Sequence, residues 1–135
     1  MVRFETVQMM LALAALENWH ITGLDVKTAF LYGELNEELY MEQPEGFRAK
    51  GQEHKVLQLL CAIYGLKQAA LAWRKAFDKS MAVMGCKHLL SDSGLFTYNG
   101  KENTHVVIIF CVDDVVFMSS DHTLIHELKQ KFMKA

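Results

Sequence analysis

The chain has 135 residues, of which 51% are hydrophobic and 22% charged, and its formal net charge is −2. This is the length of one domain, and one proline with eight glycines excludes a disordered or low-complexity chain. The net charge argues against a complete nucleic-acid-binding domain, which is usually strongly basic. The apolar runs are too short to span a bilayer, so a cytosolic or nuclear protein is expected.

The first half of the chain predicts one long helix followed by short pieces. Residues 3–18 have apolar side chains at helical spacing, and residues 20–26 are typical of a short strand that ends on Asp25. The shorter pieces are a brief helical stretch closed by Gly33, an extended piece stopped by Pro44 and Gly46 with the acidic segment EQPEG as an exposed turn, a polar loop around Gly51, and the apolar strand VLQLL.

The second half predicts two amphipathic helices around a pair of strands. Residues 66–84 place their apolar side chains on one helix face, and Asp121 is suited to cap a last helix that reaches Phe132. Between these helices, Asn99-Gly100 is a strong turn signal flanked by strand-like sequence. This mixed order predicts an α+β fold with helices on one face of an antiparallel sheet.

Two adjacent aspartates, Asp113 and Asp114, interrupt the apolar stretch FCVDDVVFMSS. A hairpin turn is the simplest interpretation, because aspartate side chains cap backbone amides in turns. However, the favoured two-residue turns contain glycine, and two carboxylates about 4 Å apart repel by roughly 1 kcal/mol in water. A divalent cation such as Mg²⁺ would offset this repulsion, with Asp25 as a candidate ligand from another element. The residues alone leave both interpretations open.

The cysteines and two of the histidines are interpreted as structural. Cys61, Cys86 and Cys111 form no C-x-x-C pair and are predicted to be reduced, mostly buried thiols. His122 and His126 have the i, i+4 spacing of a zinc pair. Without an evident third ligand, they are interpreted as an exposed helix face.

Five sequence blocks together resemble the reverse transcriptase, an RNA-directed DNA polymerase, of copia-type LTR retrotransposons. In chain order they are FETVQMMLALAA, LDVKTAFLYGELNEELYMEQPEGF, LYGLKQA, FCVDDVVFMSS and LKQKFMKA. The resemblance extends over essentially the whole chain. It implies a polymerase palm, which is a small antiparallel sheet backed by helices in a ferredoxin-like arrangement. It also implies one partial domain over residues 1–135, in which most of the fingers and the thumb are missing.

The resemblance implies a site for two-metal nucleotidyl transfer, in which dNTPs are joined to a primer 3′-hydroxyl. The catalytic residues would be Asp25, Asp113 and Asp114. Asp25 and Asp113 would be the principal metal ligands, Asp114 would lie close to the metals, and the backbone carbonyl of Val26 would add a ligand. The cofactor would be Mg²⁺, with Mn²⁺ as a substitute.

Other residues would contact the nucleotide and the primer. The residues implied in nucleotide binding are Phe30, Tyr64, Gly65, Lys67 and Gln68. Phe30 would exclude a 2′-hydroxyl, although ordinary core packing is the alternative interpretation. Lys67 would lie near phosphate or template, with a solvated helix charge as the alternative. Cys111 and Val112 would lie at the primer terminus.

Two positions depart from the family pattern. Cys111 stands where family members usually carry an aromatic residue, most often Tyr, which puts the efficiency of extension in question. Ala70 stands in place of a proline at a helix start, which is a mild change. We expect a palm fragment or a degenerate element copy, and missing basic segments would account for the net charge.

The implied partners are an RNA or DNA template with its primer, dNTPs, and the rest of a Pol polyprotein with integrase and RNase H. No membrane partner is expected. The implied location is a cytoplasmic virus-like particle, with later nuclear entry of the DNA product. The alternative function is a catalytically inactive or domesticated module that binds nucleic acid or protein, and a purely structural role is a third option. The stacking pattern of an RNA-recognition motif is absent from the sequence.

Overall fold

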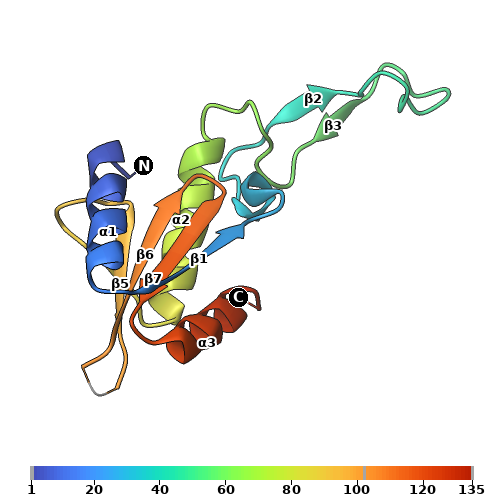
Figure 1. Ribbon diagram of the computed structural model, residues 1–135. Coiled ribbons are helices and arrows are strands. Elements are labelled where there is room, and N and C mark those ends of the chain that lie inside the picture. The colour runs from blue at the N-terminus through green and yellow to red at the C-terminus, as the bar shows by residue number, and fades with distance from the viewer. Residues whose placement is uncertain (1, 102, 135) are drawn as a thin grey trace. The chain divides into compact units, whose positions relative to one another are not determined.

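The computed structural model describes residues 2–101 and 103–134. The elements, labelled in Figure 1 where there is room, are α1 (Phe4–Leu16), β1 (His20–Asp25), the 3-10 helix η1 (Ala29–Tyr32), β2 (Tyr40–Glu42), β3 (Val56–Gln58), α2 (Ala69–Val83), β4 (Lys87–His88), β5 (Leu95–Asn99), β6 (His105–Cys111), β7 (Asp114–Ser119) and α3 (His122–Phe132). The chain divides into two compact units. The first contains residues up to 29 and from 77 onward, and the second contains residues 30–76. No helix in the described ranges is long and apolar enough to cross a membrane.

The first unit is built on a five-stranded sheet in which all neighbouring strands are antiparallel. The strand order is β1-β7-β6-β5-β4, so β1 and β4 form the edges. The predicted α+β fold with an antiparallel sheet is therefore confirmed. Strand β4 was not predicted, because two residues are too few to show an alternating pattern.

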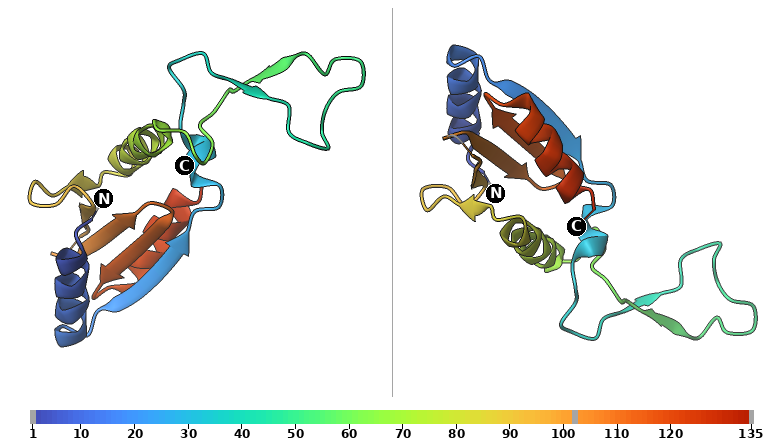
Figure 2. Two further views of the ribbon diagram at one scale, coloured as in Figure 1. Left: turned by 90° about the horizontal axis from the view of Figure 1, so that it is seen from above. Right: turned by 90° about the horizontal axis from the view of Figure 1, so that it is seen from below.

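Helices cover both faces of this sheet, so the prediction of helices on one face is wrong. On one face, Phe77 of α2 stacks on Phe110 with ring centroids 3.9 Å apart, and Phe132 of α3 lies 5.6 Å from Phe77. Figure 2 shows α3 against the sheet from two directions. On the other face, α1 contributes to a cluster with Leu95, Val107, Ile109 and Met118. The physical reason is in β6, whose residues 106–110 are all buried and need cover on both sides.

The ends of two helices follow local backbone chemistry. The side chain of Asp121 accepts hydrogen bonds from the N–H groups of Thr123 at 2.9 Å and Leu124 at 3.1 Å, which confirms it as the N-cap of α3. Helix α2 begins at Ala69 and not at residue 66 as predicted. Residues 66–69 form a turn instead, closed by a 3.1 Å hydrogen bond from the N–H of Ala69 to the carbonyl of Leu66.

The second unit contains the small antiparallel sheet β2-β3 and a close approach between two backbones. The carbonyl of Gly33 accepts a 2.9 Å hydrogen bond from the N–H of Ala62. A Cβ on Gly33 would lie 2.8 Å from the backbone nitrogen of Trp73, so only glycine allows this approach. A two-stranded sheet is marginally stable by itself, so such contacts matter for this unit.

Candidate active site

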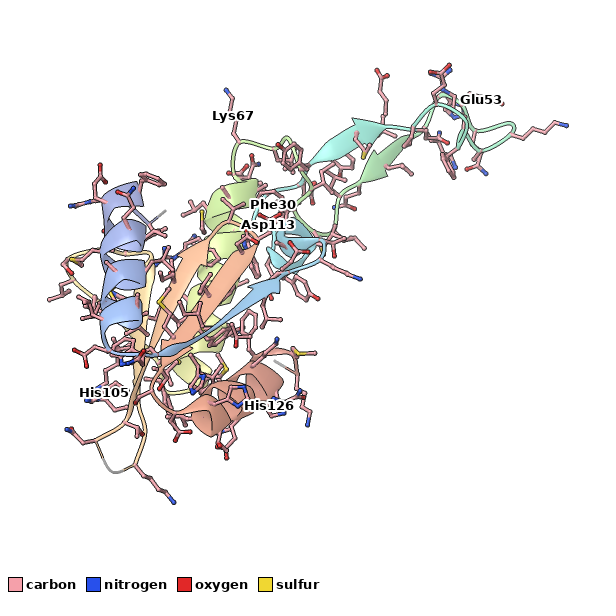
Figure 3. All side chains as sticks on the ribbon, viewed as in Figure 1. Phe30, Glu53, Lys67, His105, Asp113 and His126 are labelled. Carbon is pink, nitrogen blue, oxygen red and sulfur yellow. The ribbon has the colours of Figure 1, made fainter. Side chains whose placement is uncertain are left out.

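The two adjacent aspartates lie where β6 turns into β7. Cys111 pairs with Asp114, so the turn consists of Val112 and Asp113, and Asp114 is the first residue of β7. Figure 3 labels Asp113 at this turn. Val112 has a φ of 58°, the left-handed region that the first position of a hairpin turn of type I′ or II′ requires. The structure thus confirms that the pair forms part of a turn, with a strained β-branched residue where glycine is usual.

Strand β1 ends beside this turn. Asp25 is paired with Asp114 across the β1–β7 ladder, and the N–H of Val26 donates a 2.8 Å hydrogen bond to the carbonyl oxygen of Asp113. Directly paired residues project their side chains from the same face of a sheet. The fold therefore brings Asp25 next to the hairpin, whereas its role as a metal ligand stays a prediction.

The carboxylates of Asp25, Asp113 and Asp114 are exposed. Carboxylate oxygens are the ligands that Mg²⁺ prefers, so the donor chemistry fits a hard divalent cation. Among residues 2–101 and 103–134, however, no group of three or more His, Cys, Asp or Glu side chains is placed to hold a metal ion. Asp25, Asp113 and Asp114 are here called the carboxylate edge, and metal binding by these residues is a prediction.

The residues expected at the nucleotide belong to the second unit, whereas the three aspartates belong to the first. Phe30 is half-buried, and its ring lies 5.7 Å from the ring of Tyr64, which is itself 87% exposed. The structure brings this aromatic pair together. Phe30 is therefore neither a buried core residue nor a free surface ring, and its contact with a sugar stays a prediction.

Lys67 and Gln68 follow this aromatic pair in the sequence. Lys67 is exposed and its side chain points into solvent (Figure 3). The side-chain amide of Gln68 donates a 3.4 Å hydrogen bond to the carboxylate of Glu37, and both line an open pocket of about 170 Å³. The structure gives Gln68 a partner within its own unit, and the binding of a nucleotide by either residue is untested.

The cysteines are all free, as predicted, but they differ in burial. Cys86 is buried, and burial raises the pKa of its thiol to about 11. Cys111 is half-buried and packs against the cluster beneath α1. Cys61 is exposed, so the prediction of burial is wrong at this position.

The histidine pair of α3 behaves as an exposed helix face. His122 and His126 are both exposed, and Figure 3 shows His126 at the surface of α3. The ring of His20 lies 5.2 Å from that of His122. This edge-to-face contact links β1 to α3.

Sequence reasoning missed a buried carboxylate, Asp92, in the first unit. It accepts hydrogen bonds from the N–H of Arg3 at 3.0 Å, the hydroxyl of Thr6 at 2.8 Å and the N–H of Gly94 at 2.9 Å. Burial by itself raises the pKa of Asp92, but these hydrogen bonds and the charge of Arg3 outweigh it and leave the pKa below its ordinary value. The local sequence SDSG indicates a turn and gives no sign of partners near the N-terminus.

A second missed residue is Gln43, in the segment predicted to be an exposed turn. Gln43 is buried, so that prediction is wrong for this side chain. Its amide nitrogen donates to the carbonyls of Gln52 at 2.8 Å and Lys55 at 2.7 Å, and its oxygen accepts from the N–H of Ala49 at 2.7 Å. One side chain therefore satisfies three backbone groups of the loop between β2 and β3.

Comparison with known proteins identifies the relatives of this chain. The family described as "Reverse transcriptase (RNA-dependent DNA polymerase)" matches residues 1–135. The chain is 39% identical over 134 residues to the "Retrovirus-related Pol polyprotein from transposon TNT 1-94" of Nicotiana tabacum, covering 99% of this chain and 10% of that protein. It is 33% identical over 135 residues to the Pol polyprotein from transposon RE1 of Arabidopsis thaliana, covering 97% and 9% respectively.

A yeast relative extends this comparison. The "Transposon Ty1-BL Gag-Pol polyprotein" of Saccharomyces cerevisiae is 34% identical over 130 residues, covering 90% of this chain and 7% of that protein. The chain therefore spans at most about a tenth of the length of these relatives. No solved structure matches the chain significantly. The resemblance to copia-type elements is confirmed by these transposon relatives, and the chain belongs to the reverse transcriptase (RNA-dependent DNA polymerase) family.

Proposed function

We propose that this chain is the palm of an RNA-directed DNA polymerase that extends a primer with dNTPs. The observation that carries the proposal is the pairing of Asp25 with Asp114, fixed by the 2.8 Å hydrogen bond between Val26 and Asp113. Family membership supports the activity, and the antiparallel sheet with its helices is consistent with a palm of ferredoxin-like type. The pairing places carboxylates from two distant segments at one edge, as a two-metal site needs.

Each residue of this edge has a proposed role. Asp25, Asp113 and the carbonyl of Val26 would hold two Mg²⁺ or Mn²⁺ ions, with Asp114 supporting the site. The bound ions would make the primer 3′-hydroxyl more acidic and stabilise the pyrophosphate leaving group. The exposure of all three carboxylates leaves room for a primer end and a triphosphate to approach. The register of β1 with β7 fixes the positions from which these side chains project.

Substrates, partners and location are proposed for a larger protein of which this chain would be a part. Template, primer and dNTPs follow from the polymerase activity, with Phe30, Tyr64, Gly65, Lys67 and Gln68 at the nucleotide and Cys111 and Val112 at the primer terminus. The relatives are Pol or Gag-Pol polyproteins, which supports a polyprotein that also carries integrase and RNase H. Assembly in cytoplasmic virus-like particles is proposed on the same basis.

Primer extension on an RNA template tests the proposal. The chain is compared with Asp113→Asn and with Glu127→Gln, which removes an exposed carboxylate of α3, in the presence of Mg²⁺ or Mn²⁺. We expect Asp113→Asn to lower extension by more than about tenfold, because loss of even a supporting group at a metal site has effects of this size. Glu127→Gln should keep wild-type extension. A folded wild-type chain that extends no primer would contradict activity of this chain by itself.

One observation favours the alternative of a catalytically silent binding module. In the described part of the chain, no three metal-binding side chains are placed together. Such a module would bind a primer–template duplex equally well with Mg²⁺ or with EDTA and would extend nothing. Extension that depends on Asp113 would exclude it.

A further inference from the structure

We propose that the loop between β2 and β3 is a contact surface for single-stranded nucleic acid, and that Gln43 is the positioning residue that holds the loop in shape. The Gln43 loop is defined here as residues 43–55. The proposal concerns the second unit alone. It is independent of metal chemistry at the aspartates, and nothing in the family match assigns a role to this loop.

The Gln43 loop has a fixed backbone although most of its side chains are exposed. Besides the three hydrogen bonds of the Gln43 amide, the N–H of Phe47 donates to the carbonyl of Pro44 at 3.0 Å. Gly46 and Gly51 have φ values of 82° and 79°, where residues with a Cβ are disfavoured. These hydrogen bonds and glycines together favour one backbone conformation. A loop that only connected two strands would not need a fixed conformation.

The loop presents an exposed aromatic ring among charged side chains. Phe47 is 84% exposed, and the cations Arg48, Lys50 and Lys55 and the acid Glu45 are exposed as well. The acidic Glu53, labelled in Figure 3, turns back and accepts a 2.9 Å hydrogen bond from the N–H of Gly51. The three cations Arg48, Lys50 and Lys55 outnumber the two carboxylates of Glu45 and Glu53, so the loop has a formal charge of +1.

This combination fits a single strand better than a folded protein surface. An exposed aromatic ring stacks on unpaired bases of any sequence, and neighbouring cations neutralise the phosphates between them. Phe47 is left in water, and a base stacked on its ring would remove part of that apolar surface from water. RNA and DNA strands share this chemistry, and both are included in the test.

Fluorescence anisotropy measures the binding of three labelled oligonucleotides of equal length: single-stranded RNA, single-stranded DNA and abasic DNA. EDTA is present throughout, so the result does not depend on metal-dependent extension and can fail separately from it. We expect the wild-type chain to bind base-containing strands more tightly than abasic DNA, because stacking needs a base. Phe47→Ala should weaken binding of the base-containing strands about tenfold and leave abasic binding nearly unchanged.

The charged residues are tested by salt. Replacing Arg48 and Lys50 together by Ala should lower the slope of log K against log [salt] by about 1.4, since each phosphate contact on a single strand contributes about 0.7. Replacing Lys131 and Lys134, two exposed lysines of the first unit, is the matched control and should leave the slope unchanged.

The positioning role of Gln43 is tested by Gln43→Met, which keeps Phe47 and the cations. We expect the preference for bases to disappear and the amide of Ala49 to exchange faster, while the amides of β6 stay protected. Leu60→Ala, which truncates another exposed apolar side chain of the same unit, should have no effect. Equal losses in Leu60→Ala and Phe47→Ala, or no binding of any oligonucleotide, would overturn the proposal. Unchanged base preference in Gln43→Met would overturn the role of Gln43.

Discussion

The carboxylate of Asp92 accepts a 3.0 Å hydrogen bond from the backbone N–H of Arg3, although 89 positions separate the two residues. Arg3 is the N-cap residue of α1, and its own side chain makes no capping hydrogen bond. A negative charge near a helix N-terminus is stabilising, because it interacts with unpaired N–H groups and the helix dipole. Asp92 therefore caps α1 from the loop before β5 and ties the first helix to the sheet.

Replacing Asp92 by Asn tests this cap. We expect Asp92→Asn to lower the free energy of unfolding by about 2 kcal/mol at pH 7, because both carboxylate oxygens accept hydrogen bonds and the amide of asparagine would place an NH₂ group against one set of donors. Urea denaturation followed by circular dichroism measures the difference. Asp121→Asn is the matched control, since asparagine caps helices as well as aspartate does and should cost little there.

The same pair predicts a pH dependence. The pKa of Asp92 lies below its ordinary value in the folded chain, so the carboxylate contributes stability that is fully present above the unfolded pKa of about 3.9. That contribution is lost as the pH falls through the lower, folded pKa. The stability difference between wild type and Asp92→Asn should therefore shrink below about pH 4. A difference that stays constant down to the acid transition would contradict a charged Asp92.

The strained turn at Val112 predicts that glycine is stabilising there. A β-branched residue at a φ of 58° costs on the order of 1–3 kcal/mol, whereas glycine adopts this conformation freely at a smaller entropic cost. We expect Val112→Gly to raise the free energy of unfolding by up to about 1 kcal/mol, which shows as a higher urea midpoint. Val116→Gly, within β7, should lower it. Similar losses in both variants would show that the turn is not strained.

The close approach at Gly33 predicts sensitivity to a single methyl group. In Gly33→Ala the new Cβ would meet the backbone nitrogen of Trp73 at 2.8 Å, so the second unit must shift at a cost of about 1–3 kcal/mol. Faster hydrogen exchange at the amide of Ala62, which bonds to the carbonyl of Gly33, measures this loss. Gly23→Ala is the control, because no heavy atom beyond its own residue and its two chain neighbours lies within 4 Å of its Cβ position, and its exchange pattern should match wild type.

The two cysteines of contrasting burial predict selective alkylation. Burial raises the pKa of Cys86 to about 11, so almost none of its thiol is ionised at pH 8. Iodoacetamide at pH 8 should modify exposed Cys61 quickly and Cys86 only after denaturant is added, as mass spectrometry of peptides would show. Rapid labelling of Cys86 in the native chain would mean that its surroundings open readily.

Elements with local signals could be predicted from the sequence. Asp121 caps α3 by accepting hydrogen bonds from residues of that same helix, and the strand predicted over residues 20–26 to end on Asp25 is found as β1 (His20–Asp25). The covering of both sheet faces also had a signal, because the unbroken apolar run from Val106 to Phe110 is typical of a strand buried on both sides. Antiparallel sheets commonly have one face in solvent, and the prediction of helices on one face followed that general rule.

The features that could not be predicted depend on partners far away in the sequence or on backbone atoms. Asp92 looks like a turn residue, and nothing near it indicates Arg3 or Thr6. Gln43 lies in a polar segment, and its partners are carbonyl and amide groups that every residue carries. For the candidate site, the sequence indicated the aspartates, whereas the pairing of Asp25 with Asp114 required the register of the sheet.

The position of β1 at the edge of the sheet has a consequence for synthesis. Its one neighbour is β7, which pairs Asp25 with a residue about 90 positions later in the chain. At a translation rate of roughly 5–20 residues per second, the ribosome would need about 4–18 s to synthesise the residues between Asp25 and its partner Asp114. During that interval β1 exposes an unpaired backbone to other nascent chains. The carboxylate edge is thus among the last parts of the first unit to assemble, and the insertion of residues 30–76 lengthens the delay.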